Sequence, residues 1–239
     1  GRPFLTDLGY PQSWATIRKW EGNWATHNSV WGVIPDGNHE LVAGRGRLIR
    51  TLFTEGIQVL ELEAERWITD AERQKWVKPG VSYRRLIALV ETDDDGVAVI
   101  DFSRIQGGTE HWRTCRGLQG NFSTADLTLT SQPGTISSAD GIRGTVDPLM
   151  NPDYAGLSCM DQVAGSPLSP VWQGTWASTV EPGVFLDLHQ IAVSDQATLL
   201  SARSTALMGT PEQSDYHFHT LLWRRPSQAS DPATHIDLV

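Results

Sequence analysis

The feature that most constrains the fold is a series of short segments with alternating apolar and polar residues, separated by turn signals. The turns are rich in Gly, Pro, Asp and Asn, as at 35–38, 94–96 and 182–183. Between 56 and 67 the alternation places leucines on one face and glutamates on the other. Because successive side chains of a strand point to opposite faces, this pattern predicts antiparallel strands and an all-β fold.

About eleven strands are expected from this pattern. Their ranges are 22–31, 44–53, 56–67, 83–91, 97–105, 109–117, 121–130, 172–179, 184–193, 198–205 and 216–224. Helix is expected only at 11–20 and at 70–77, the second after a capping-box pattern at 69–72. Residues 147–170 are interpreted as a long connection, 1–227 as a single domain and 228–239 as a flexible tail.

The expected architecture is a closed antiparallel β-barrel of about 10–12 strands with a short N-terminal helix, because closure leaves no exposed sheet edge. A barrel of more than eight strands cannot fill its interior with its own side chains, so it encloses a cavity. A sandwich of two sheets is the alternative.

The pattern Trp-x-Gly-x-Trp occurs twice, at 20–24 and at 172–176. Gly lets a strand bend where it starts, and a Trp two residues later closes the floor of a barrel. The first copy resembles the motif of the calycin superfamily, which comprises the lipocalins and their relatives. In that family an Arg near the end of the last strand packs across this Trp, and Arg224 and Arg225 stand at the corresponding place. The resemblance implies a calycin-like barrel, larger than a typical lipocalin.

The expected catalytic residues lie on two strands. His217 and His219 share one strand face, a spacing that suits a metal ion, but a third ligand is missing apart from His189. We therefore favour hydrogen bonding to a ligand or proton transfer over metal binding, and histidines that are exposed or have a purely structural role are the alternative. Arg84 and Arg85 point to opposite faces, and an inward Arg would polarise a ligand oxygen. The expected catalytic set is His217, His219, Arg85 and Tyr216.

The expected ligand-binding residues combine aromatic planes with one polar pair. Asp187 and His189 share a strand face, where the carboxylate would fix the tautomer of the imidazole. Ten Trp residues in 239 supply an unusual number of stacking surfaces. The expected ligand-binding set is Trp24, Phe53, Tyr83, Trp112, Trp176, Asp187, His189 and Trp223.

The resemblance implies two candidate functions, because calycin-like barrels include cyclases and pericyclases of natural-product pathways as well as plain carriers. The first is a cofactor-free cyclase or pericyclase that confines a hydrophobic, conjugated molecule and polarises one of its oxygens, as in a hetero-Diels–Alder cyclisation. The second is a carrier or chaperone of a lipid, pigment or bilin, which needs only an apolar cavity and one polar anchor. No phosphate loop or dinucleotide fingerprint occurs, so no nucleotide cofactor is expected.

The charge of the chain bears on its partners, and its cysteine content bears on its cellular compartment. The chain has 28 acidic and 19 basic residues, a formal charge of −9, which argues against nucleic acid as a partner. No apolar run approaches the roughly 18 residues of a membrane span. Cys115 and Cys159 are a possible disulfide, and Asn121 begins a glycosylation sequon. Together they favour a secretory route, and the oligomeric state is left open.

Overall fold

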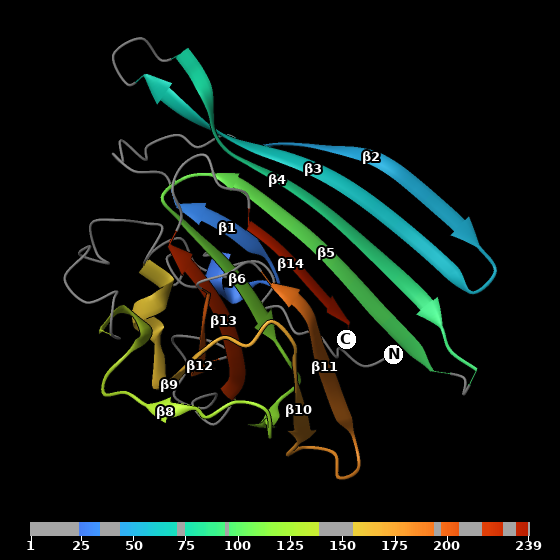
Figure 1. Cartoon of the computed structure of the whole chain (residues 1–239), viewed down its shortest axis with the longest axis vertical. Helices are drawn as coiled ribbons and strands as arrows, with labels where there is room; N and C mark the ends of the chain where they lie inside the picture. Colours follow the sequence, from blue (N-terminus) through green and yellow to red (C-terminus); the bar gives the residue numbers. More distant parts are fainter. Residues whose placement is uncertain are drawn as a thin grey trace.

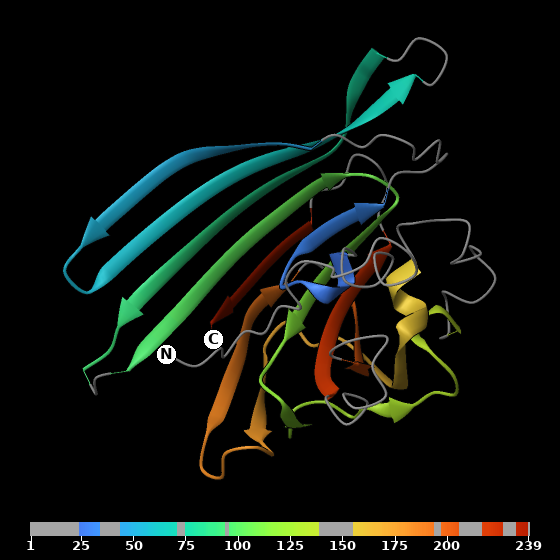
Figure 2. The ribbon, with the colours of Figure 1, turned by 180° about the vertical axis from the view of Figure 1, so that it is seen from behind.

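The computed structural model describes residues 24–33, 44–70, 75–93, 96–138, 155–193, 197–205, 217–226 and 233–238. These residues form an all-β protein of antiparallel strands in two sheets (Figures 1 and 2). Within those ranges, helical geometry is confined to the short 3-10 segments η1 (Trp24–Thr26), η3 (Ile136–Ser138) and η4 (Ala155–Cys159). The expected all-β class is confirmed, whereas the expected helix at 11–20 lies outside the described residues.

Each sheet is a linear series of strands. The six-stranded sheet runs in the order β1 (Val30–Val33), β6 (Glu110–Arg116), β13 (His217–Pro226), β12 (Thr198–Thr205), β9 (Met160–Pro167) and β8 (Thr130–Ser131). The eight-stranded sheet runs in the order β2 (Gly44–Thr54), β3 (Ile57–Asp70), β4 (Lys75–Glu91), β5 (Val97–Gly107), β14 (Ala233–Leu238), β11 (Phe185–Val193), β10 (Trp172–Ser178) and β7 (Gly120–Ser123).

The prediction of a closed barrel is wrong, because the two edge strands of each sheet do not pair with each other and both sheets are open. β1, an edge strand of the six-stranded sheet, lies against β4 and β5 of the other sheet. There the amide of Gly32 donates to the Tyr83 hydroxyl at 3.1 Å, and the carbonyl of Gly32 accepts from Arg66 at 2.8 Å. A Cβ on Gly32 would lie 2.5 Å from a methyl carbon of Val81. Side chains therefore satisfy this edge, where a barrel would need a strand ladder.

The six-stranded sheet buries both of its faces. One face packs against the eight-stranded sheet through a cluster that includes Trp172, Trp176, Leu199, Leu221 and Trp223. The opposite face packs against the 3-10 segments through a cluster that includes Trp24, Trp112, Ile136, Leu157 and Met160. Both clusters are filled by side chains, so most of the tryptophans serve the packing of the fold.

The second Trp-x-Gly-x-Trp copy forms the start of β10, where both tryptophans are buried. The Phe122 ring from the neighbouring β7 lies 6.3 Å from the Trp172 ring and 4.9 Å from the Trp176 ring. A Cβ on Gly174 would lie 2.5 Å from that Phe122 ring. The glycine therefore leaves room for an aromatic ring between two tryptophans, which is a packing role.

In the first copy, Trp24 belongs to η1 and not to a strand. Within the described part of the strand expected at 22–31, only residues 30 and 31 are in a strand, the start of β1 (Val30–Val33). Trp20 and Gly22 lie outside the described residues. The Trp24 ring stacks on Trp31 at 6.0 Å and lies 5.6 Å from Trp112. Arg224 lies 5.7 Å from the Trp112 ring, so the expected Arg covers a neighbour of Trp24 in the same cluster.

Several expected elements differ from the structure. Residues 121–130 form a strand only at β7 and β8, and residues 233–238 form β14 where a flexible tail was expected. β9 lies within the expected long connection. The expected helix at 70–77 is wrong at its described positions, because Asp70 ends β3 and pairs with Lys75, the first residue of β4. The long β3–β4 ladder here overrides the local capping pattern.

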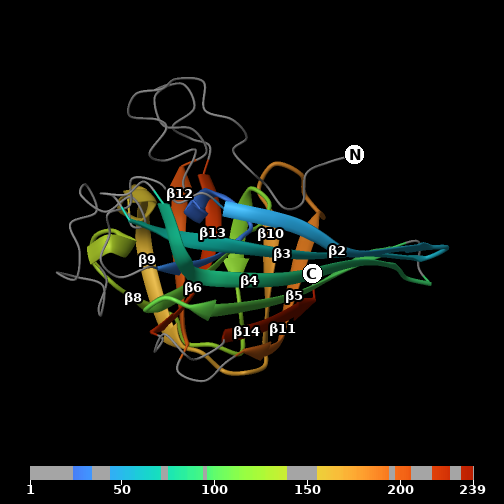
Figure 3. The same cartoon turned by 90° about the horizontal axis from the view of Figure 1, so that it is seen from above.

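The ends of β2 to β5 that meet at the β2–β3 turn and at the β4–β5 turn extend beyond the six-stranded sheet (Figure 3). Directly paired residues of antiparallel strands point to the same face. The pairings Phe53–Gln58–Leu89–Val99 and Leu60–Ile87–Asp101 therefore place these residues on the face that bears Asp101 and faces β6. We call the apolar members of this face the inner strip: Phe53, Leu60, Ile87, Leu89, Val97 and Val99. Phe53, Leu89 and Val97 are exposed.

Both cysteines are free thiols, so the disulfide that the sequence left open is not formed. Cys115 belongs to the cluster between the sheets, whereas Cys159 packs against the cluster on the other face of the six-stranded sheet. The sheet itself separates them. Among the described residues, there is also no helix with the length and apolar character needed to cross a membrane.

Candidate ligand-binding site

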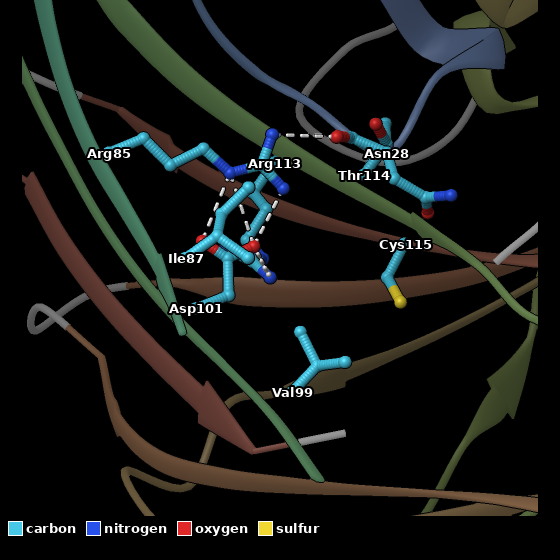
Figure 4. Close-up of a pocket in the computed structure, with 8 residues that line it drawn as sticks. All are labelled: Asn28, Arg85, Ile87, Val99, Asp101, Arg113, Thr114 and Cys115. Atoms are coloured by element: carbon cyan, nitrogen blue, oxygen red, sulfur yellow. Dashed lines mark hydrogen bonds and ion pairs between the residues drawn. The ribbon is translucent and has the colours of Figure 1, made fainter. Parts of the chain in front are cut away.

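A pocket lies between the two sheets, where β4 and β5 face β6 (Figure 4). Its volume is about 70 Å³, which corresponds to a few water molecules. Its lining residues are Asn28, Arg85, Ile87, Val99, Asp101, Arg113, Thr114 and Cys115. The pocket thus combines two guanidinium groups and one carboxylate with an apolar wall.

The polar part of the pocket is a three-residue ion network. Arg85 donates from Nε to the Asp101 carboxylate at 3.0 Å and from Nη2 at 2.7 Å. Arg113, from the opposite sheet, donates from Nη2 to Asp101 Oδ2 at 3.0 Å and from Nη1 to Ser103 at 3.1 Å. Arg85 also donates from Nη1 to the Asn28 carbonyl at 2.8 Å. One carboxylate therefore orients two guanidinium groups across the space between the sheets.

Electrostatics keep this carboxylate charged. Burial alone would raise the pKa of Asp101, but the charges and hydrogen bonds of Arg113 and Arg85 outweigh burial and lower that pKa below its ordinary value. The Asp101 side chain is 7% exposed, that of Arg113 is 4% exposed and that of Arg85 is 23% exposed. Arg85 is therefore the member of the network that a ligand in the pocket can reach.

The inward position of Arg85 follows from strand alternation. Its neighbour Arg84 points to the other face of β4, where its guanidinium pairs with Glu61 at 2.6 Å. On that outer face Glu61 also lies 3.6 Å from Arg50, and Glu63 pairs with Arg47. The sequence-based expectation of one guanidinium on each face is confirmed, and the structure adds that Arg85 is the inner one.

The apolar part of the pocket continues into the inner strip. Ile87 and Val99 line the pocket, and Leu89 is paired directly with Val99 on the same face. Leu89 is 42% exposed and Val97, two residues before Val99, is 58% exposed. A polar end at Arg85 and an apolar surface leading away from it therefore lie on one sheet face.

His219 lies elsewhere, in the core between the sheets near β7. Its Nε2 is 2.5 Å from the Ser201 hydroxyl, and its ring stacks on Phe122 with 5.2 Å between ring centres. Burial lowers the pKa of His219 from 6.5 to about 4. At neutral pH the imidazole is therefore uncharged and packed, in contact with a buried serine hydroxyl.

The other expected catalytic residues are separate from the pocket. His217 is half-buried on β13. It interacts electrostatically with Asp161, whose carboxylate pairs with Arg203 at 2.7 Å. Among the described residues, no group of three or more His, Cys, Asp or Glu side chains is arranged to hold a metal ion. Tyr216 lies outside the described residues. Of the expected catalytic set, Arg85 is the residue that the structure places in the pocket.

Asp187 and His189 share the outer face of β11, because they alternate with the buried Leu186 and Leu188. They line an open, polar pocket of about 330 Å³ together with residues of β7, β10 and the segment after β7. Asp187 accepts a hydrogen bond from the Thr175 hydroxyl at 2.6 Å. The eight-stranded sheet therefore separates this outer pocket from Arg85.

The expected aromatic ligand contacts have mainly structural positions. Trp24, Trp112, Trp176 and Trp223 belong to the two packed clusters. Tyr83 accepts the Gly32 amide proton at the sheet junction. Phe53 is 69% exposed and belongs to the inner strip. None of these six side chains lines the pocket of Figure 4.

Sequence reasoning missed Asp101, Arg113 and Asn28. A signal for Asp101 was present in the expected strand 97–105, whose inner face reads Val97, Val99, Asp101, Ser103 and Ile105. Polar residues in the middle of an apolar strand face indicate a buried polar partner. For Arg113 and Asn28 no comparable local signal exists, because they approach Asp101 and Arg85 from another part of the chain.

A comparison with models of known protein families matched none of them, and a comparison with curated proteins found no match. The calycin resemblance therefore stays a prediction that rests on the Trp-x-Gly-x-Trp pattern. What the chain does is inferred from the pocket and its surroundings.

Proposed function

We propose that this protein binds a hydrophobic small molecule between its two sheets, with an oxygen-bearing end at Arg85 and an apolar body along the inner strip. The observation that carries the proposal is the continuity of a partly exposed guanidinium with an exposed apolar surface on the same sheet face. Neither feature alone would point to an amphiphilic ligand, whereas their combination does.

The energetics favour an apolar occupant. Burying one aliphatic or aromatic side chain yields about 1.5–3 kcal/mol, and the inner strip offers several that are still in contact with water. A hydrogen bond from the charged Arg85 to a ligand oxygen adds about 1.5–3 kcal/mol and fixes the orientation of the ligand. The inner strip would supply most of the affinity, and Arg85 would fix the position of the oxygen-bearing end of the ligand.

Cyclisation of a conjugated small molecule is the second candidate function. It is favoured by one observation, the position of Arg85, since a guanidinium beside a ligand carbonyl stabilises the negative charge that develops there. The expected His217 and His219 contribute nothing at this pocket. Binding needs only the groups that are present, so we place carriage of the ligand before its conversion.

The test uses all-trans-retinol, a neutral molecule with one hydroxyl on a long conjugated body, titrated by its own fluorescence. Leu89→Asn places a polar group in the inner strip, and we expect the Kd for retinol to rise by about fivefold or more, the loss of one apolar contact. The matched control is Leu52→Asn, because Leu52 is 47% exposed but pairs with Val59 and Ala88 on the opposite face.

We expect the Leu52 variant to bind retinol as the unmodified protein does. Equal weakening by both substitutions, or retinol binding that does not saturate, would contradict the proposed function. Circular dichroism of both variants checks that the fold is retained.

A further inference from the structure

We propose that the ligand of the inner pocket is a monoanion, a long-chain or polyene carboxylate whose head group binds Arg85. This inference rests on the proposed binding function and adds the charge class of the ligand. The side chains that line the pocket include two guanidinium groups, Arg85 and Arg113, and a single carboxylate, Asp101. Among these lining side chains the positive charges exceed the negative charges by one, which one negative charge on a ligand balances.

The excess charge is located on Arg85. Arg113 is 4% exposed and holds Asp101 from the side of β6, so that this buried carboxylate is already neutralised from within the protein. The Arg85 guanidinium is 23% exposed and shares the same carboxylate. A charge that is partly desolvated and only partly compensated binds an anion more strongly than a solvated surface Arg does.

Donor geometry supports the same assignment. A guanidinium has five N–H donors in a planar fork. The bonds of Arg85 to Asp101 and to the Asn28 carbonyl engage one hydrogen each on Nε, Nη1 and Nη2, and the Nε hydrogen is shared between the two oxygens of Asp101. Among the described residues, one hydrogen on Nη1 and one on Nη2 are thus left for a ligand. A carboxylate accepts two such hydrogens, whereas an alcohol or an ether uses the site less fully.

The surroundings argue for one charge and an apolar remainder. The pocket wall beyond Arg85 consists of Ile87, Val99 and Cys115, and the inner strip continues with Leu89. A phosphate monoester or a dicarboxylate would place a second charge against this apolar wall without a partner, at a large desolvation cost. The ligand class that fits both ends is therefore an apolar chain or ring system with a single carboxylate.

The experiment compares all-trans-retinoic acid with all-trans-retinol at pH 8, where the acid is ionised and the carbon skeleton is the same. We expect the acid to bind the unmodified protein at least about tenfold more tightly, because its carboxylate forms an ion pair with Arg85 and accepts two hydrogens, whereas the neutral hydroxyl of retinol forms no ion pair. In Arg85→Gln this preference should disappear. The matched control Arg84→Gln, on the outer face of the same strand, should keep it.

Arg85→Lys retains the positive charge but not the planar fork of donors, so we expect this variant to keep part of the preference for the acid. The same variant keeps the inference testable if Arg85→Gln does not fold. Equal affinity of the unmodified protein for the acid and the alcohol would overturn the monoanion inference and leave the binding function intact. An equal loss of preference in the Arg84 and Arg85 variants would also overturn it. If neither compound binds, the proposed function itself fails.

Discussion

The neighbouring residues Arg84 and Arg85 have different roles, because Arg84 pairs with Glu61 on the outer face and Arg85 pairs with Asp101 in the pocket. Alternation in a strand separates Arg84 from Arg85, and this follows from the sequence. The sequence does not say which face lies inside, because apolar residues occur on both faces of β4. The partner Asp101 stands on another strand, and Arg113 comes from the other sheet. The candidate site was therefore only partly predictable, since its charges come together through pairing of distant segments.

His219 permits a test at the same scale through the pH dependence of stability. In the unfolded chain its imidazole takes up a proton near pH 6.5, but in the folded state burial delays this to about pH 4. The contribution to stability is complete above pH 6.5 and is lost as the pH falls from 6.5 towards 4. Between pH 7 and pH 5 we expect His219 to account for a loss of about 2 kcal/mol in the free energy of unfolding.

The measurement is urea unfolding at pH 7 and at pH 5, for the unmodified protein and for His219→Gln. Glutamine retains a hydrogen-bonding group for Ser201 but does not titrate. The variant should therefore lose about 2 kcal/mol less than the unmodified protein over this interval. The same loss in both proteins would show that His219 is not buried in its neutral form.

At the scale of elements, most strands were predictable because alternation and turn residues are local signals. The exceptions have local physical causes. In 124–129 the Thr124 hydroxyl donates to the Gln173 carbonyl and Asp126 accepts the Gln173 amide, so side chains replace the expected strand ladder. β14 is recognisable only from its place between β5 and β11, which sequence periodicity does not contain.

The β10 motif gives a prediction about its glycine. In Gly174→Ala the new methyl group meets the Phe122 ring, and overpacking of this kind costs about 1–3 kcal/mol in the free energy of unfolding. The control is Gly46→Ala in β2, where the nearest atom to a Cβ is a carbonyl oxygen at 3.9 Å. That variant should be unchanged or slightly more stable. Chemical denaturation that gives the same stability for both variants would contradict the packing role of Gly174.

At the scale of the whole molecule, the sequence was compatible with a closed barrel and with a sandwich of two sheets. The structure has two sheets, and neither is closed. Inward and outward positions are local properties, whereas closure depends on whether distant edge strands meet. Here β1 is held by the side chains of Tyr83 and Arg66 and does not enter a ladder with the other sheet. The consequence is that the candidate site combines a small pocket with an open apolar surface, where the sequence predicted an enclosed chamber.

Photo-crosslinking tests the central claim most directly, because it reports where a ligand lies. A fatty acid with a diazirine group on its chain is irradiated with the protein, with and without excess retinoic acid, and the labelled peptides are identified by mass spectrometry. We expect the label on β4 and β5, between Arg85 and Val99, and its loss in the presence of the competitor. Label confined to the outer pocket at Asp187 and His189, or label that retinoic acid does not displace, would contradict the account.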